Sequence, residues 1–198
     1  MVKAYDRAYF DRWYRDPGRR VGTAAELARQ VALAVAAAEV VLARPIRSVL
    51  DVGCGEAPWC PVLRRLRPEV RYLGVDQSPY AIARYGRSRR IVSGSFGSLA
   101  SLNLPDPYDL VVCADVLHYV PDEELSRGLR EMSRLVGGVA FLEVQTQGDS
   151  FKGDRRGWVP RTARRYRSLF RRAGLVPCGL HLWLGPEAAA WASALERG

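Results

Sequence analysis

Two glycines and an acid have the types and spacing of a nucleoside-binding site. Gly53 and Gly55 follow the apolar run 49–52, and Asp76 ends a second apolar run that begins at Tyr72. A buried strand, a glycine turn, a helix and a strand ending in a carboxylate form one half of an open α/β sheet. The glycines let the backbone approach a ligand closely, and Asp76 is placed to accept hydrogen bonds from ribose hydroxyls.

The residues after Gly55 decide between classes of nucleoside. A dinucleotide fingerprint needs a third glycine three residues after the second, and Pro58 stands there. A phosphate-binding P-loop needs Gly-Lys-Ser or Gly-Lys-Thr, whereas Gly55 is followed by Glu56 and Ala57. Because Glu56 would repel a phosphate, the sequence predicts a nucleoside that lacks phosphates and carries a positive or zwitterionic group.

Segments in three places resemble, in order and spacing, the motifs of class I S-adenosylmethionine-dependent methyltransferases. Residues 51–57 resemble the first motif, 72–76 the second and 108–120 the fourth, within a resemblance that spans roughly 47–184. The resemblance implies a doubly wound, mostly parallel, Rossmann-like α/β sheet of six or seven strands with helices on both faces. It also implies S-adenosyl-L-methionine as cofactor and methyl transfer as activity. Ala57 departs from the family, which usually has a third glycine there.

The resemblance assigns cofactor contacts to residues at the ends of several strands. Asp51 is expected to order the glycine turn or to touch the amino group of the methionine end. Ser95 stands where the family often has an acid that accepts the adenine amino group, and Phe96 offers a backbone amide to adenine. Trp59, near the ligand, could narrow the pocket. The implied cofactor-binding residues are Asp51, Gly53, Cys54, Gly55, Asp76, Gln77, Ser95, Phe96 and Asp115.

A candidate general base follows the fourth predicted strand. His118 lies three residues beyond Asp115 and titrates near neutrality, which suits proton removal from a hydroxyl or amine. The alternative is that His118 packs the turn before Pro121. Candidates for a lid or an acceptor contact are Trp13, Tyr14 and Glu143, together with the loop 145–160.

The chain is interpreted as a single domain over 1–198, with an N-terminal helical cap over 1–45, a cofactor-binding core over 46–184 and a tail over 185–198. Thr23 to Glu26 form a capping box that opens a long helix. Strands are predicted over 47–52, 71–76, 90–93, 109–114, 138–144 and 175–184, and helices over 58–67, 79–86, 122–135 and 161–173. Because 186–195 look helical, the presence of a seventh strand stays open.

Composition favours one globular domain in a reducing compartment. Four cysteines are scattered without metal-ligand spacing, so we expect no metal site and a cytoplasmic location. The longest apolar stretch, 31–43, is too short to span a bilayer, and the N-terminus lacks the apolar core of a secretory signal. The net charge of +9 comes almost entirely from arginine. It allows nucleic-acid binding, although a solvated arginine-rich face explains it better.

Three functions remain open from the sequence. The leading one is in-line methyl transfer to oxygen, nitrogen or carbon of a small-molecule acceptor. An RNA or protein methyltransferase is the second, using the arginines at 155, 156, 161, 164 and 165. The third is a non-catalytic S-adenosylmethionine-binding protein, motivated by Ala57, Trp59 and Ser95.

Overall fold

The chain folds around a seven-stranded sheet in the order β3-β2-β1-β4-β5-β7-β6, seen in a computed structural model that describes residues 3–105 and 107–192. Strands β1 to β5 are parallel, and β7 runs antiparallel to both β5 and β6. The strands are β1 (Ser48–Val52), β2 (Arg71–Asp76), β3 (Ile91–Ser93), β4 (Tyr108–Ala114), β5 (Val136–Glu143), β6 (Val176–Gly179) and β7 (Leu182–Leu184).

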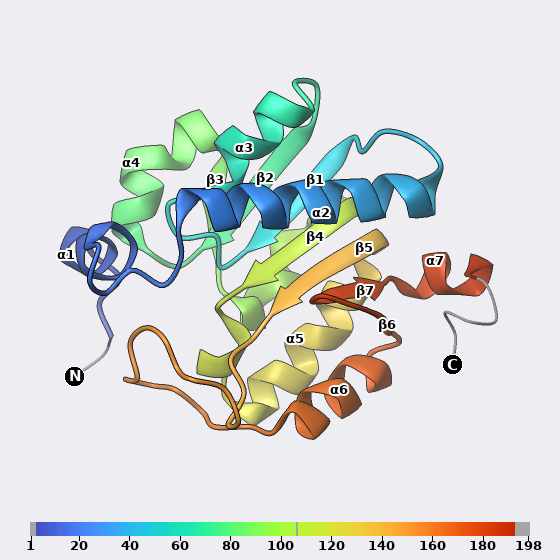
Figure 1. The fold of residues 1–198 in the computed structure, drawn as a ribbon. Helices are drawn as coiled ribbons and strands as arrows, with labels where there is room; N and C mark the ends of the chain where they lie inside the picture. The colour runs from blue at the N-terminus through green and yellow to red at the C-terminus, as the bar shows by residue number, and fades with distance from the viewer. Residues whose placement is uncertain (1–2, 106, 193–198) are drawn as a thin grey trace.

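Helices cover both faces of the sheet, because the central strands are apolar on both sides and need two packed layers. In Figure 1, α2, α3 and α4 lie above the sheet, and α5 and α6 lie below it. The upper layer consists of α2 (Ala24–Leu42), α3 (Trp59–Leu66) and α4 (Pro79–Arg89). The lower layer consists of the short 3-10 helix η2 (Phe96–Leu102), α5 (Asp122–Arg134) and α6 (Ala163–Arg172). The predicted doubly wound architecture is confirmed.

The strand order reverses between β1 and β4, which creates a crevice at the carboxyl ends of these strands. The N-terminal segment lies at this edge, as α1 (Arg7–Phe10) followed by one π-helical stretch η1 (Asp11–Arg15). In Figure 1 the arrowheads of β4 and β5 point toward the side on which α1 lies. The fold therefore brings a segment remote in sequence to the edge where a ligand would bind.

The last part of the sheet differs from the sequence prediction. A single strand over 175–184 was wrong, because residues Leu180 and His181 adopt positive φ values of 50° and 67° and turn the chain back. The result is a β6–β7 hairpin, so a seventh strand is present. Helix α7 (Pro186–Trp191) follows, and the end of the predicted helix at 193–195 lies outside the described residues.

Capping explains where the helices begin. Thr23 accepts the backbone N–H of Glu26 at 3.1 Å, and the Glu26 carboxylate accepts the N–H of Thr23 at 2.7 Å. The predicted capping box is confirmed. Ser78 caps α4 by accepting the N–H of Ala81 at 3.0 Å. Within the described residues, no helix is long and apolar enough to cross a bilayer.

Candidate cofactor and acceptor site

A cavity of about 290 Å³ opens at the carboxyl ends of β1, β2, β3 and β4. Its size is at the lower end of the range for small-molecule sites. Its walls come from the glycine turn, the ends of four strands, the start of α5 and the N-terminal segment. The lining residues are Tyr5, Tyr9, Phe10, Tyr14, Gly53, Gly55, Asp76, Gln77, Gly94, Ser95, Phe96, Ala114, Asp115, Val116, Tyr119, Val120, Pro121 and Glu124.

The glycine turn after β1 has the backbone conformation that glycine permits. Gly53 and Gly55 have φ values of +71° and +54°, in the left-handed region. A Cβ at Gly53 would lie 2.4 Å from a methyl carbon of Val116, and one at Gly55 would lie 2.9 Å from the ring of Phe10. Ala57 also has a positive φ, +55°, which explains why glycine is the easier residue at this position.

Asp76 connects the end of β2 to the glycine turn. Its carboxylate accepts the backbone N–H of Gly55 at 2.7 Å and that of Ser78 at 2.8 Å, one on each oxygen. Each carboxylate oxygen keeps capacity for a further hydrogen bond toward the cavity. Burial raises the pKa of Asp76, and the backbone N–H donors oppose that shift.

Asp51 and Cys54 lie behind the turn and do not line the cavity. The Asp51 carboxylate accepts the hydroxyl of Tyr72 at 2.6 Å, and burial raises the pKa of Asp51 to about 7. The Cys54 thiol packs toward Gly74, where an added Cβ would lie 2.6 Å from the sulfur. The hydrogen bond that orders the turn comes from Asp76, whereas sequence reasoning expected it from Asp51.

Gln77, after β2, and Ser95 and Phe96, after β3, line the cavity. The ring of Phe96 packs against α5, since a Cβ at Gly128 would lie 2.4 Å from it. Glu124, in the first turn of α5, also lines the cavity. Ser95 supplies no carboxylate to this wall of the cavity, and Glu124 from α5 supplies one instead.

Trp59 lies in the core and outside the cavity. It is buried, and its ring centroid is 5.1 Å from that of Phe141. The expectation that Trp59 narrows the pocket was wrong, because the first turn of α3 directs this side chain against the sheet.

Asp115 follows β4 and enters the cavity in a left-handed conformation, with φ of +61°. Its backbone N–H donates to the Glu143 carbonyl at 3.0 Å, and its carboxylate accepts the Gln145 side-chain amide at 3.0 Å. Burial raises the pKa of Asp115 to about 6. Glu143 itself does not line the cavity, and its carboxylate accepts the amide of Gln30 at 3.1 Å.

His118 lies behind Asp115 and is fully buried. Its Nδ1 accepts the backbone N–H of Gln145 at 3.3 Å, which places the proton of the neutral ring on Nε2. Nε2 lies 3.5 Å from an Asp115 oxygen and has no hydrogen-bond partner among the residues that the structure describes. Burial lowers the pKa of His118 to about 4. His118 is therefore next to the site without lining it, and its basic lone pair is already engaged.

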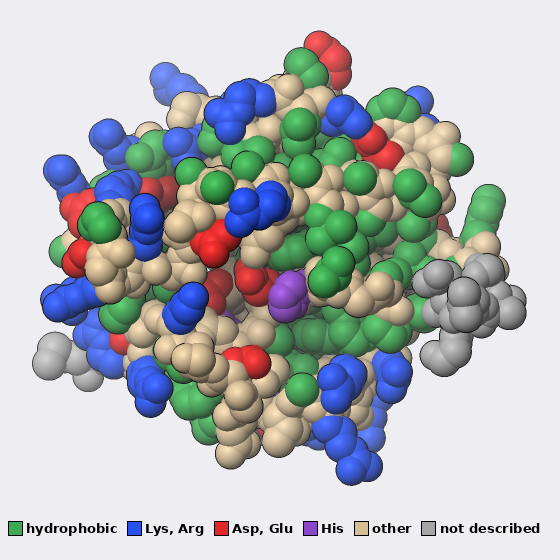
Figure 2. Space-filling model, in the orientation of Figure 1, with side chains coloured by type: hydrophobic (Ala, Val, Ile, Leu, Met, Phe, Trp, Pro, Cys, Tyr) green, Lys and Arg blue, Asp and Glu red, His purple; other side chains and the backbone are tan. Residues whose placement is uncertain are grey.

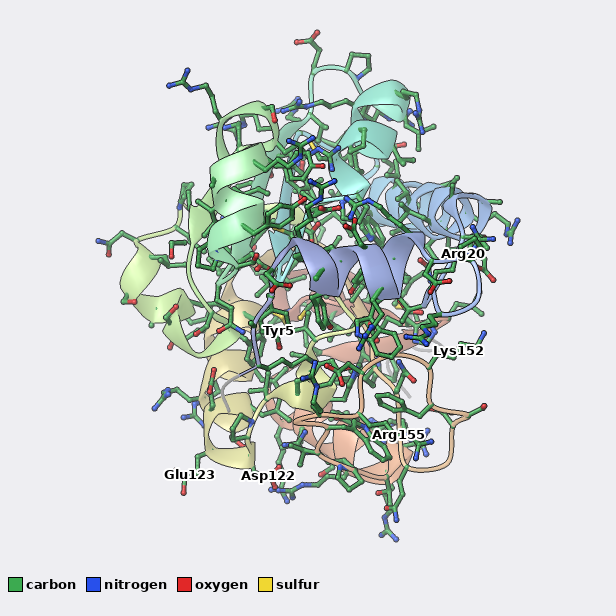
Figure 3. All side chains as sticks on the ribbon, turned by 90° about the vertical axis from the view of Figure 1, so that its left-hand side faces the viewer. Tyr5, Arg20, Asp122, Glu123, Lys152 and Arg155 are labelled. Carbon is green, nitrogen blue, oxygen red and sulfur yellow. The ribbon has the colours of Figure 1, made fainter. Side chains whose placement is uncertain are left out.

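The N-terminal segment supplies the aromatic side of the cavity through Tyr5, Tyr9, Phe10 and Tyr14. Ser78 donates to the Tyr5 carbonyl at 2.5 Å, and Arg15 forms two hydrogen bonds of 2.6 and 2.7 Å with Glu56. In Figure 3 the labelled Tyr5 lies near the centre of the view, above the loop that carries Lys152 and Arg155.

Trp13 does not line the cavity, whereas Tyr14 does. The sequence analysis proposed Trp13 and Tyr14 as lid candidates, and of these two only Tyr14 forms part of the wall. Sequence reasoning singled out neither Tyr119 nor Glu124, because a tyrosine after a histidine and an acid in a first helical turn are ordinary. Phe10, which is buried over Gly55, was not among the residues proposed for the site.

Several arginines form hydrogen bonds or ion pairs with other residues of the chain. Arg161 is buried, and its guanidinium donates to Asp122 at 2.6 Å and to the Val120 carbonyl at 2.6 Å. Arg156 pairs with Asp154 at 3.1 Å. Figure 2 shows Lys and Arg side chains spread around the visible face instead of gathered in one patch. Arg161 is therefore a structural residue, not part of an exposed basic surface.

The sheet order, the glycine turn and the acid at the end of β2 define an α/β nucleoside-binding protein. A family model described as a methyltransferase domain matches residues 19–194. The chain therefore belongs to this methyltransferase family, and S-adenosyl-L-methionine is its cofactor.

Two curated relatives and one solved structure illustrate the similarity. Trans-aconitate 2-methyltransferase of Methylobacterium nodulans is 38% identical over 84 residues, which cover 42% of this chain and 32% of the relative. Ubiquinone biosynthesis O-methyltransferase of Pseudomonas paraeruginosa is 28% identical over 104 residues, which cover 50% and 44%. The match thus spans less than half of the length of either relative.

The solved structure is magnesium protoporphyrin IX methyltransferase from Synechocystis with bound S-adenosylmethionine. It has a TM-score of 0.58 and 20% identity, and the match covers 86% of this chain and 82% of that one. This likeness shows the fold.

The residues of the cavity fit S-adenosylmethionine. Gly53 and Gly55 leave the turn free of side chains, and Asp76 retains acceptor capacity for a ribose. Among the described residues that line the cavity, Asp76, Asp115 and Glu124 are acids and none is a lysine or arginine. An acidic cavity suits a ligand with a sulfonium and an ammonium group, and it is unsuited to a phosphate.

Proposed function

We propose that this protein transfers the methyl group of S-adenosylmethionine to a small-molecule acceptor by in-line displacement. The observation that carries the proposal is the hydrogen bond between Asp76 and the glycine turn at one wall of an acidic cavity. When bound, the cofactor supplies a methyl group that is already activated by a positive sulfur. The chain must therefore bind, align and exclude water, which provides much of the acceleration.

The strand order supports one orientation of the bound cofactor in the cavity. Asp76 at the end of β2 takes the ribose, and the wall with Ser95 and Glu124 takes adenine. We further propose that the Glu124 carboxylate accepts the adenine amino group in place of the missing acid at Ser95. The methionine end then runs past Gly53 toward β4, and the acceptor approaches beside Asp115.

The N-terminal segment supports a small acceptor. Its aromatic rings close one side of the cavity, and the ion pair between Arg15 and Glu56 holds them over the glycine turn. Trans-aconitate, named for one relative, is a tricarboxylate, and a cavity without lysine or arginine offers it no partner. We therefore do not propose trans-aconitate as the methyl acceptor of this protein. The cysteines Cys54, Cys60 and Cys113 are buried thiols, in keeping with a proposed cytoplasmic location.

The role of His118 as a general base stays a prediction, and its placement favours support of Asp115 instead. The lone pair of Nδ1 accepts the Gln145 N–H, so His118 would have to break this bond before it could take a proton. The methyl transfer step itself does not require a side chain to remove a proton from the substrate.

Calorimetric titration with S-adenosylmethionine and S-adenosylhomocysteine tests the cofactor site. Asp76→Ala removes a charged hydrogen-bond acceptor, which costs about 1.5–3 kcal/mol in total, so affinity should fall about ten- to hundredfold. Glu124→Gln should weaken S-adenosylhomocysteine but not its 6-oxo analogue, S-inosylhomocysteine, which lacks the amino group. Glu123→Gln, an exposed neighbour on α5, is the matched control. Unchanged affinity in a folded Asp76→Ala variant would show that the ribose assignment is wrong. A protein that binds the cofactor tightly but methylates no acceptor would support the non-catalytic alternative.

A further inference from the structure

The part of the cavity beside β4 carries a carboxylate, Asp115, that is separate from the proposed ribose and adenine walls. Asp76 belongs to the end of β2 and Glu124 to the start of α5, whereas Asp115 lies after β4, next to β5. Asp115 contacts Gln145, which follows β5, at 3.0 Å. The position of Asp115 is therefore on the acceptor side of the orientation proposed above.

Asp115 is held as a partly buried hydrogen-bond acceptor by the groups around it. The Gln145 amide donates to one carboxylate oxygen, and the protonated Nε2 of His118 lies 3.5 Å from the same oxygen. No hydrogen bond is formed to the second oxygen within the described part of the chain. The Asp115 side chain is 24% exposed, and its second oxygen keeps acceptor capacity that a ligand in the cavity can use.

The backbone at Asp115 supports a ligand-directed role. Its φ of +61° lies in the left-handed region, where a non-glycine residue is held at a cost. The bond from its N–H to the Glu143 carbonyl at 3.0 Å fixes this conformation. The carboxylate consequently projects into the cavity instead of continuing the strand.

Tyrosine rings next to Asp115 form a wall suited to a cation. Tyr9, Tyr14 and Tyr119 all line the cavity. The chain itself shows that these rings accept an ammonium: Lys3 Nζ lies 3.7 Å from the ring centroid of Tyr119 and 5.2 Å from that of Tyr9. Such contacts are attractive because the ring face is electron-rich. Lys3 pairs with Asp154 at 3.6 Å, and its charge also stabilises the ionised form of Asp115, against the burial that raises the pKa of this carboxyl.

We propose that the methyl acceptor is a small amine and that Asp115 is the residue that selects it, by binding its N–H groups against the tyrosine wall. The inference rests on the proposed function, because it assumes that the nucleoside occupies the β1–β2–β3 side of the cavity. It disfavours carboxylates and other anions as acceptors, since each would face Asp115, and no lysine or arginine is among the described residues that line the cavity. Phenols and alcohols could enter but would bind Asp115 less strongly than an amine that arrives protonated. Such an amine must first release one proton to solvent, because only the neutral nitrogen has the lone pair that attacks the methyl carbon as the thioether of S-adenosylhomocysteine leaves.

Binding of three isosteric probes tests the proposal without any turnover. Benzylamine, benzyl alcohol and benzoate differ in charge but little in size, and each is titrated into the protein saturated with S-adenosylhomocysteine. Benzylamine should bind tightest and benzoate weakest. Asp115→Asn should reduce benzylamine affinity about ten- to hundredfold while leaving benzyl alcohol within about twofold. Asparagine tolerates a positive φ, so the backbone should be kept.

Glu143→Gln is the matched control, because this carboxylate stands nearby but does not line the cavity. It should leave all three probes unchanged. Preference for benzoate, absence of benzylamine binding, or equal benzylamine affinity in wild type and Asp115→Asn would each overturn the proposal. A loss of S-adenosylhomocysteine affinity in Asp115→Asn, with benzylamine unaffected, would place Asp115 against the cofactor and also overturn it. Failure of the proposed function is distinguishable, because the wild type would then bind no S-adenosylhomocysteine.

Discussion

Replacing Gly53 by alanine should destabilise the protein in two separable ways. The backbone φ of +71° is left-handed, which costs a non-glycine residue about 1–2 kcal/mol. The new Cβ would also stand 2.4 Å from Val116 Cγ2. Forcing the two apart adds about 1–3 kcal/mol, as for an overpacked core. The free energy of unfolding should therefore fall by about 2–5 kcal/mol.

Equilibrium unfolding in urea measures this loss, and a second substitution separates its parts. In a Val116→Ala background the clashing methyl groups are absent and only the Cβ of residue 116, at 3.2 Å, stays close, so Gly53→Ala should cost little more than the backbone contribution. The four proteins form a double-mutant cycle, whose coupling energy should be about 1–3 kcal/mol and favour the double variant. Because Val116 lines the cavity, Gly53→Ala should also weaken cofactor binding.

Gly157 provides the matched control. Its φ is +75°, close to that of Gly53, and nothing lies within 4 Å of a Cβ added there. Gly157→Ala should therefore cost the backbone contribution alone. If Gly53→Ala were no more destabilising than Gly157→Ala, the steric part of the reasoning would be refuted. If neither substitution changed the free energy of unfolding, the expected cost of a left-handed alanine would be refuted.

Two further predictions concern protonation and the arginine surface. Burial lowers the pKa of His118 in the folded protein to about 4, whereas its usual value, expected in the unfolded chain, is 6.5. Between pH 6.5 and 4 the unfolded chain therefore binds a proton at His118 and the folded protein does not. Stability should thus be lost as pH falls from 6.5 to 4, by at most about 3 kcal/mol. His118→Asn, which keeps an acceptor for Gln145, should flatten that part of the unfolding free energy against pH; an identical curve would contradict the assignment. RNA should bind only weakly at physiological salt, and tight, salt-sensitive binding that disappears on neutralising Arg155, Arg164 and Arg167 would favour a nucleic-acid substrate.

The parts of the fold that the sequence predicted are those determined by local spacing. Apolar runs of strand length, glycine after β1 and an acid after β2 each carry their signal within a few residues. The capping box at Thr23 and the Ser78 cap are equally local. For this reason the helices and strands of the core were found within a few residues of their observed bounds.

The failures depend on contacts between distant segments. His118 suggested catalysis because of its type and position, yet its Nδ1 is satisfied by the N–H of Gln145, on another strand end. Trp59 follows the glycine turn in sequence but faces the core. Glu124 reads as an ordinary acid at a helix N-terminus, and only the packing of α5 against η2 brings it to the cavity. The periodicity of the sequence contains no information on these tertiary contacts.

The net charge of the chain and the charge of its cavity have opposite signs, and they bear on different questions. A net charge of +9 suggested an anionic partner, and arginines account for nearly all of the positive charge. The cavity lining, however, contains three acids and no arginine or lysine among the described residues. Long-range attraction acts on encounter and is screened by salt within about 10 Å, whereas a half-buried carboxylate acts at contact distance and is screened much less. The selection of the acceptor should therefore follow Asp115 and the tyrosine wall, and the arginine surface should affect solubility and weak, salt-sensitive association.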